Sequence, residues 1–457
     1  MGIPMGAASA ADHEHPETQG DPETGTRSVR RNPNARAQRI GCDICVVGSG
    51  AAGISAALEA ARLGRRVVLV DGLPSLGGQA VNSIIGTYCG LYSNGTHGYQ
   101  FTHGIADDIL RDLGAQDKAL FYRHGPITTV VYYDEIALSR WVETNVQKAG
   151  ITLLLGAIMR NVERDGRRIR SLELVTRYGD VIVEATGFVD ASGDAALAYQ
   201  AGFECRESAG HPVYGTQMVV VENINEDAHP TRDEMRIRME EKGDEYGLLR
   251  RNAVSFVIPG RRIAALNMTH TETPLDPVAM SKSALSGKDQ ADLAVRFVRE
   301  QFPACFGQAK VRAYGMPGIR QTRWIAGRHQ LTLDEVRSGY RHPDAIGRTA
   351  WPVELHDTDK GYVWQSFPPE HVHYVPLGSL IPHEGDNLVA AGRCIDADLA
   401  ALSSVRVMGP CMAMGAAAAH ALDLAGSGSV NQIDISFLQK RLSDNLDRKD
   451  APWEIRA

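Results

Sequence analysis

The stretch from Cys42 to Asp71 reads CDICVVGSGAAGISAALEAARLGRRVVLVD and decides the fold of the chain. An apolar run of strand length, Ile44 to Val47, precedes a group of closely spaced glycines. The alanine-rich segment Ile54 to Leu63 then has the composition of a helix, and Val67 to Val70 is a second apolar, β-branched run. This order of strand, tight turn, helix and strand predicts a Rossmann-like domain of the α/β class.

The glycines have the spacing of a dinucleotide-binding turn. Gly48 would make the turn, Gly50 would let a pyrophosphate approach the backbone, and Gly53 would let helix and strand pack closely. The phosphates would lie at the helix N-terminus, which favours negative charge. Asp71 would accept hydrogen bonds from a ribose. The cofactor contacts predicted in this stretch are Gly48, Gly50, Ala51, Ala52, Gly53, Asp71 and Gly72.

A second glycine turn follows in Pro74 to Gln79, which reads PSLGGQ. A nicotinamide dehydrogenase does not need this turn, whereas FAD runs on past the pyrophosphate and requires a second close approach of the backbone. Here the chain resembles the large two-dinucleotide-binding-domain flavoprotein group. The resemblance implies FAD, which we expect to be bound non-covalently, with Gly77, Gly78 and Gln79 as contacts.

Further FAD contacts are predicted where later strands run into small residues. A β-meander, with arms at 157–162 and 169–176, commonly covers the adenine in this flavoprotein group and would place Ile158 at the cofactor. The segments GFVDASGDAAL, Gly187 to Leu197, and NLVAAGRC, Asn387 to Cys394, each end an apolar strand in a turn of small residues. The contacts predicted downstream of Gln79 are Ile158, Ala191, Ser192, Gly193, Asp194, Gly392, Arg393, Met408 and Gly409.

The length of 457 residues predicts two interleaved domains. Residues 1–40 are rich in Pro, Gly, Glu, His and Arg and are expected to form a disordered tail. The FAD-binding domain is expected at 41–205 and 386–457, the second part including a C-terminal helix. An α+β substrate domain is expected to be inserted at 206–385.

Composition narrows the class of protein. The net charge of −7 and the pI of about 6.1 argue against a nucleic-acid partner. No apolar run approaches the roughly 20 residues that a membrane span needs, so we expect a soluble, cytoplasmic protein. The 7 cysteines are an odd number and do not resemble a disulfide framework. No metal site is predicted, and a homo-oligomer is left open.

The first catalytic candidates lie in two segments. The loop Ala80 to Gly104 leaves directly from the second glycine turn and is expected to reach the flavin ring. Its candidates are Tyr88, Cys89, His97 and His103. In MPGIRQTR, Met316 to Arg323, Arg320 and Arg323 have a spacing that can share one helix face and bind a carboxylate.

Two more candidates come later in the chain. His371 and His373 alternate on a predicted strand, and one of them would act as a general acid or base. Arg406 would place a positive charge at the flavin pyrimidine edge or hold an anionic substrate. Arg406 is the strongest catalytic candidate.

Three motifs together carry a family resemblance: GGQ, PGIRQTRWIAG at Pro317 to Gly327, and AGRCIDAD…SSVRVMG from Ala391 to Gly409. They resemble the FAD-dependent oxidoreductase family, which is similar more distantly to the fumarate reductase and succinate dehydrogenase flavoproteins. The resemblance implies the fold and FAD. The family often carries an arginine where this chain has Gly378.

The expected function is that of an FAD enzyme moving hydride or electrons between flavin N5 and a small organic substrate, with an unidentified electron acceptor. A flavin monooxygenase or oxidase is the alternative enzyme. A catalytically silent FAD-binding subunit, which would transfer electrons or act as a scaffold, is the alternative of another class. The chain carries no W-x-W-x-I-P motif of the flavin-dependent halogenases.

Overall fold

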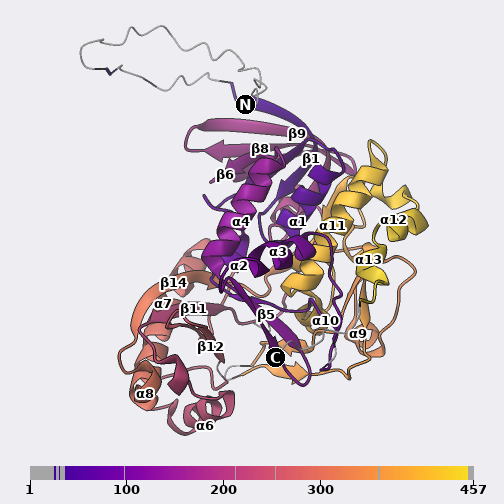
Figure 1. The fold of residues 1–457 in the computed structure, drawn as a ribbon. Coiled ribbons are helices and arrows are strands. Elements are labelled where there is room, and N and C mark those ends of the chain that lie inside the picture. The colour runs from indigo at the N-terminus through magenta and orange to yellow at the C-terminus, as the bar shows by residue number, and fades with distance from the viewer. Residues whose placement is uncertain are drawn as a thin grey trace, which may run out of the picture.

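The computed structural model describes residues 25–26, 30, 36–96, 98–210, 213–252, 254–358 and 361–450. The tail expected at 1–40 lies almost wholly outside these residues, and so does His97. The fold is the predicted Rossmann-like α/β arrangement, built on a sheet whose strands come from distant parts of the chain (Figure 1). The strands run in the order β6 (Thr152–Leu155), β2 (Val67–Asp71), β1 (Gln38–Val47), β9 (Gly179–Asp190), β8 (Arg168–Thr176) and β7 (Ile158–Asp165), and β20 (Leu388–Ala390) also pairs with β9.

The central strand β1 pairs in parallel with both β2 and β9. Its last residue, Val47, lies opposite Val70 on one side and Asp190 on the other. The second half of β1 is buried, as expected for a parallel strand covered on both faces, and this explains its continuous apolar run. The predicted meander is confirmed, because β7, β8 and β9 pair in antiparallel fashion.

Helices α1 (Ala51–Arg62) and α11 (Met408–Ala425) lie side by side although they come from opposite ends of the chain (Figure 1). A Cβ atom added at Gly415 would lie 2.1 Å from the carbonyl oxygen of Ala52, so the two backbones approach closely. The run of small residues in α11 therefore serves helix packing. Helices α3 (Ile105–Gly114) and α4 (Glu135–Lys148) pack on each other. Apolar residues at helical spacing in the sequence predict them at Ile105 to Leu113 and Ile136 to Lys148.

A second, antiparallel sheet occupies the middle of the chain, away from the Rossmann-like sheet (Figure 1). Its order is β12 (Val254–Ile258), β13 (Ile263–Asn267), β11 (Thr216–Glu222) and β14 (Lys310–Gly318), and the neighbouring helices are α6 (Arg232–Lys242), α7 (Pro277–Gln301) and α8 (Pro303–Phe306). The sequence predicts a helix only at Asp289 to Gln301, but α7 begins at Pro277, because Asp276 caps its N-terminus and Pro277 occupies the first helical position.

Shorter elements complete the described chain. They are α2 (Gly78–Asn82), β3 (Thr87–Tyr88), β4 (Leu120–His124), β5 (Thr129–Tyr133), α5 (Ala196–Gln200), β10 (Cys205–Glu207), β15 (Arg323–Ile325), α9 (Leu333–Ser338), β16 (Ala345–Thr349), β17 (Val353–Leu355), β18 (Val363–Gln365), β19 (His373–Pro376), α10 (Leu399–Val405), α12 (Ile435–Arg441) and α13 (Ser443–Leu446).

The expectation that Arg320 and Arg323 share a helix face is wrong. Residues before them belong to β14, which pairs with β11, and Arg323 begins β15, which pairs with β10. Sheet pairing on both sides leaves Arg320 in a connection. Arg323 instead forms an ion pair with Glu207 at 3.0 Å and lies over the ring of Tyr199.

Within the described residues, no single helix is long and apolar enough to cross a membrane. The bent pair α10 and α11, which meet at 88°, passes the same test of length and composition only when taken together.

Candidate functional site

A cleft of about 540 Å³ opens where the parallel strands β1, β2, β9 and β20 end. The carboxyl edge of such a sheet is where α/β proteins bind their ligands. Many residues predicted to contact the cofactor line this cleft, as do two of the candidate arginines. They are Gly48, Gly50, Ala51, Ala52, Asp71, Gly78, Gln79, Ala191, Ser192, Gly193, Asp194, Gly392, Arg393 and Met408, with Arg320 and Arg406.

The turn after β1 has room for a ligand at one glycine and none at the other two. A Cβ at Gly53 would lie 1.8 Å from the carbonyl oxygen of Gly48, and a Cβ at Gly48 would lie 2.3 Å from that of Ala191. Gly50 precedes α1 as its N-cap, with no capping side chain, and a Cβ there would meet no protein atom within 4 Å. The free N–H groups at the start of α1 therefore face open space that suits a phosphate.

The second glycine turn packs directly on the first. Gly77 and Gly78 have φ of +93° and +51°, and a Cβ at Gly78 would lie 2.6 Å from the Cα of Gly50. The N–H of Gly77 donates to the carbonyl of Ser49 at 3.1 Å. These left-handed conformations and the close approach explain why both positions are glycine.

Asp71 lines the cleft at the end of β2. Its Oδ2 accepts hydrogen bonds from the N–H and the hydroxyl of Ser49, at 2.7 and 2.6 Å, and its Oδ1 accepts one from the N–H of Leu73 at 2.8 Å. These bonds hold the carboxylate in place and leave it acceptor capacity. Its contact with a ribose stays a prediction.

Arg393 places a cation in the cleft beside the turn after β9. A Cβ at Gly193 would lie 2.1 Å from Nη2 of Arg393, so glycine makes room for the guanidinium. Nη1 of Arg393 is buried and forms no hydrogen bond with the described part of the chain. An unpaired donor of this kind suits the oxygens of a dinucleotide cofactor, and with the open start of α1 it fits FAD.

Five predicted contacts, Gly53, Gly72, Gly77, Ile158 and Gly409, are not among the residues that line the cleft. Gly53 and Gly77 pack within the two turns, and Ile158 lies 3.5 Å from a Cβ built at Gly72. Gly409 would place a Cβ 2.5 Å from the backbone of Gly90, and its N–H donates to the carbonyl of Cys89 at 2.9 Å. The Gly77-Gly78 pair and the sequence RVMG, Arg406 to Gly409, therefore reflect tight backbone packing around the site as much as contact with a ligand.

Tyr88 and His373 are not among the cleft-lining residues. Tyr88 is buried, and its ring centroid lies 4.5 Å from that of Tyr133. His373 is fully buried between His371, at 3.1 Å, and the hydroxyl of Ser404, at 2.9 Å. Burial lowers the pKa of His373 to about 3, so its ring is neutral. The catalytic roles proposed for both residues stay predictions.

The loop after the second glycine turn contributes Cys89 to the cleft, as expected for a segment that reaches the flavin. Burial raises the pKa of this thiol to about 12, so it stays protonated at neutral pH. His103 instead lies against Asp107, 3.2 Å from its carboxylate.

A group of buried charged residues lies at the end of the cleft. The sequence pattern indicated only two of them, Arg320 and Arg406. Glu354, on β17, lines the cleft together with Arg320 and Arg406. Nη2 of Arg406 donates to the backbone carbonyl of Glu354 at 3.2 Å, and Nη1 of Arg320 donates to that of Tyr214 at 2.7 Å. The buried Arg250 lies behind them and donates to Asn267, another cleft residue, at 2.7 Å.

Glu354 is the anion of this group. Although burial by itself would raise its pKa, the hydrogen bond from His356, at 3.1 Å, and the charges of Arg406 and Arg320 lower the pKa of Glu354 to about 2. Burial and the neighbouring Arg320 hold the pKa of His356 well below its usual range. Burial, followed by the charges of Arg250 and Arg406, likewise lowers the pKa of Arg320. Glu354 is therefore ionised and His356 neutral, and the arginines outnumber the carboxylate.

The chain belongs to the FAD dependent oxidoreductase family, whose model matches residues 43–442. Its cofactor is therefore FAD, and the family supports an enzymatic role. No curated protein matches the chain.

Solved structures that resemble the chain include a geranylgeranyl bacteriochlorophyll reductase-like protein from Thermoplasma acidophilum, with 13% identity, a TM-score of 0.48, and coverage of 90% of this chain and 85% of that one. The flavin-dependent brominase Bmp2 has 14% identity, a TM-score of 0.45, and coverage of 89% and 83%. The anhydrotetracycline hydroxylase OxyS from Streptomyces rimosus has 12% identity, a TM-score of 0.42, and coverage of 89% and 66%.

Proposed function

We propose that the protein is a dehydrogenase or reductase that transfers hydride between the N5 atom of FAD and a small organic anion such as a carboxylate. The observation that carries this proposal is the excess of guanidinium groups around Glu354, at one end of the cleft. Arg320 and Arg406 line it and Arg250 lies directly behind, whereas Glu354 is the carboxylate among them.

An excess of buried cations is costly unless an anion accompanies it. The Nε atom of Arg406 is buried without a hydrogen-bond partner among the described residues, although its Nη2 is bonded to Glu354. A planar guanidinium with free N–H groups suits a carboxylate, which accepts two parallel hydrogen bonds. A bound substrate anion would therefore complete the charge balance.

The protein's own groups would bind and orient the substrate. Arg406 and Arg320 would hold its negative charge, and Glu354 would keep the two guanidinium groups in place through charge attraction. FAD supplies the electron chemistry when bound, and the protein supplies position and electrostatics. The low pKa of Glu354 excludes it as a proton donor at neutral pH.

The test is an anaerobic titration of the FAD-loaded protein with small organic acids, each paired with its neutral amide. We expect one acid to bleach the oxidised flavin absorption, and its amide to do so far more weakly because the arginines lose their counter-charge. Equal bleaching by acid and amide would contradict the anion site.

Two other outcomes would favour the alternatives. Oxygen-dependent hydroxylation of a neutral aromatic compound would indicate a monooxygenase. Activity that disappears on removal of a co-purifying protein would indicate an electron-transfer or scaffold subunit.

A further inference from the structure

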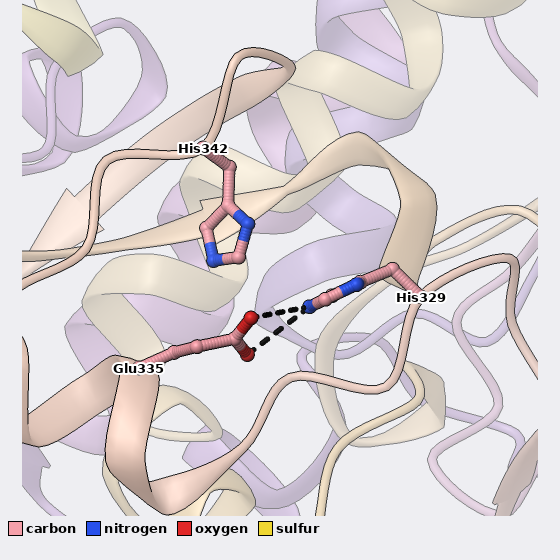
Figure 2. A group of neighbouring side chains, drawn as sticks. All are labelled: His329, Glu335 and His342. Carbon is pink, nitrogen blue, oxygen red and sulfur yellow. Dashed lines mark hydrogen bonds and ion pairs between the residues drawn. The ribbon is translucent and has the colours of Figure 1, made fainter.

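Away from the FAD cleft, His329, Glu335 and His342 converge on one small volume (Figure 2). One ligand atom from each side chain lies within 4.8 Å of the other two. The Nε2 atom of His329 lies 3.0 Å from Oε1 of Glu335. None of the three residues lines the FAD cleft. This cluster is therefore a feature that electron transfer at the flavin does not explain.

The ion pair between His329 and Glu335 does not explain why His342 lies beside them. It is 94% buried, and its Nε2 atom is buried without a hydrogen-bond partner in the described chain. Burial lowers the pKa of His342, which keeps the imidazole neutral with a lone pair available. Its ring centroid lies 4.9 Å from that of His329. An unsatisfied buried nitrogen on an imidazole that lies beside a carboxylate and a second imidazole indicates a missing ligand.

We propose that His329, Glu335 and His342 bind one divalent transition-metal ion, with Zn²⁺ as the best match. Two imidazole nitrogens and one carboxylate oxygen are a common protein donor set for zinc, with water as the fourth ligand. Zinc–ligand distances of about 2.0–2.2 Å place tetrahedral ligand atoms about 3.4 Å apart. The three ligand atoms lie within 4.8 Å of one another, so the most separated pair would approach by up to about 1.4 Å on binding an ion.

The Glu335 carboxylate can bind a metal without giving up its structural role. Its Oε2 accepts hydrogen bonds from the N–H and hydroxyl of Thr332, at 2.8 and 3.0 Å, and so closes the capping box of α9. Burial alone would raise the pKa of Glu335, but the hydrogen bonds from Thr332 and the neighbouring His329 lower this pKa. Oε1 lies 3.0 Å from Nε2 of His329, and this direct contact is the one that a metal bound between the two atoms would replace.

The backbone around His329 is already held in place. Its N–H donates to the carbonyl of Gly378 at 3.2 Å, and its carbonyl accepts from the hydroxyl of Ser379 at 2.9 Å. A Cβ at Gly378 would lie 3.0 Å from the Cβ of His329, so the arginine expected there has no space beside this histidine. A metal would tie α9, which carries Glu335, to the segment between β15 and α9, which carries His329, and to the segment before β16, which carries His342. It would therefore rigidify this part of the fold.

The experiment is a Zn²⁺ titration of the chelator-treated, FAD-loaded protein by calorimetry, repeated with Co²⁺, whose visible absorption reports tetrahedral coordination. We expect a site of one equivalent, which stabilises the protein against heat. His342→Gln and Glu335→Gln should each weaken binding at least tenfold. Glu335→Gln keeps an acceptor for the α9 cap, so it remains informative if His342→Gln does not fold.

His383→Gln is the matched control. His383 is a partly exposed histidine whose Nε2 lies 3.5 Å from Glu204, but it belongs to no group of three potential ligands among the described residues. The control should bind Zn²⁺ like the parent. Unchanged affinity and stoichiometry in both site variants would place the ion elsewhere and would overturn the proposal. Absence of Zn²⁺ and Co²⁺ binding to the parent would also overturn it.

Discussion

Arg406 and Glu354 are joined through a backbone carbonyl and not through a direct salt bridge. Nη2 of Arg406 donates to the carbonyl oxygen of Glu354 at 3.2 Å, and the Glu354 carboxylate turns to His356 and to the indole N–H of Trp351. The carboxylate thus attracts the arginine without occupying its guanidinium donors. This arrangement keeps Arg406 available for an anion in the cleft.

Replacing Arg406 by Gln should lower kcat/KM for the acid substrate about 100-fold, because a charge-assisted contact of a few kcal/mol is lost. Steady-state kinetics with the acid and its amide measure the effect. The amide should be affected much less than the acid. FAD content should stay close to that of the parent, and an equal loss for both compounds would point to a disturbed flavin.

Replacing Glu354 by Gln should destabilise the protein at neutral pH. The pKa of Glu354 is lowered from 4.5 to about 2, a difference equivalent to about 3 kcal/mol in favour of the folded, ionised state. That stability is present above pH 4.5 and is lost as pH falls toward 2. Denaturant unfolding of both proteins should therefore show a gap that narrows below pH 4.5, and a gap independent of pH would contradict this assignment.

Two glycines of the first turn should respond differently to alanine. Gly53→Ala would place a Cβ 1.8 Å from the carbonyl oxygen of Gly48, and we expect loss of folded protein. At Gly50 nothing lies within 4 Å of a Cβ, so Gly50→Ala should fold but bind FAD at least tenfold more weakly. Thermal unfolding of the apoprotein and a flavin titration distinguish the two. Unaltered FAD affinity in Gly50→Ala would place the pyrophosphate elsewhere.

Replacing His373 by Asn should change stability more than catalysis. The ring is fully buried and its two nitrogens face His371 and Ser404, so the variant loses internal hydrogen bonds at a cost of about 1–3 kcal/mol. The pH profile of kcat should keep its shape. A profile that loses one limb in this variant would restore His373 as the general acid or base.

The nucleotide-binding part of the fold and the cofactor could be predicted from residue order alone. The glycine turn, the helix after it and the acidic end of β2 are adjacent in the chain, and their geometry follows from local spacing and backbone conformation. The meander, α3 and α4 were predictable for the same reason, since each has its own periodicity.

Only the tertiary structure decided which charges meet. Arg250, Arg320, Glu354 and Arg406 come from separate segments, and no local pattern relates Glu354 to the cleft. Arg320 and Arg323 also have different partners, because strand pairing on both sides replaces the helix that their spacing predicted. Charges act through space and burial, and both depend on how distant segments pack, so this part of the site could not be derived from residue order.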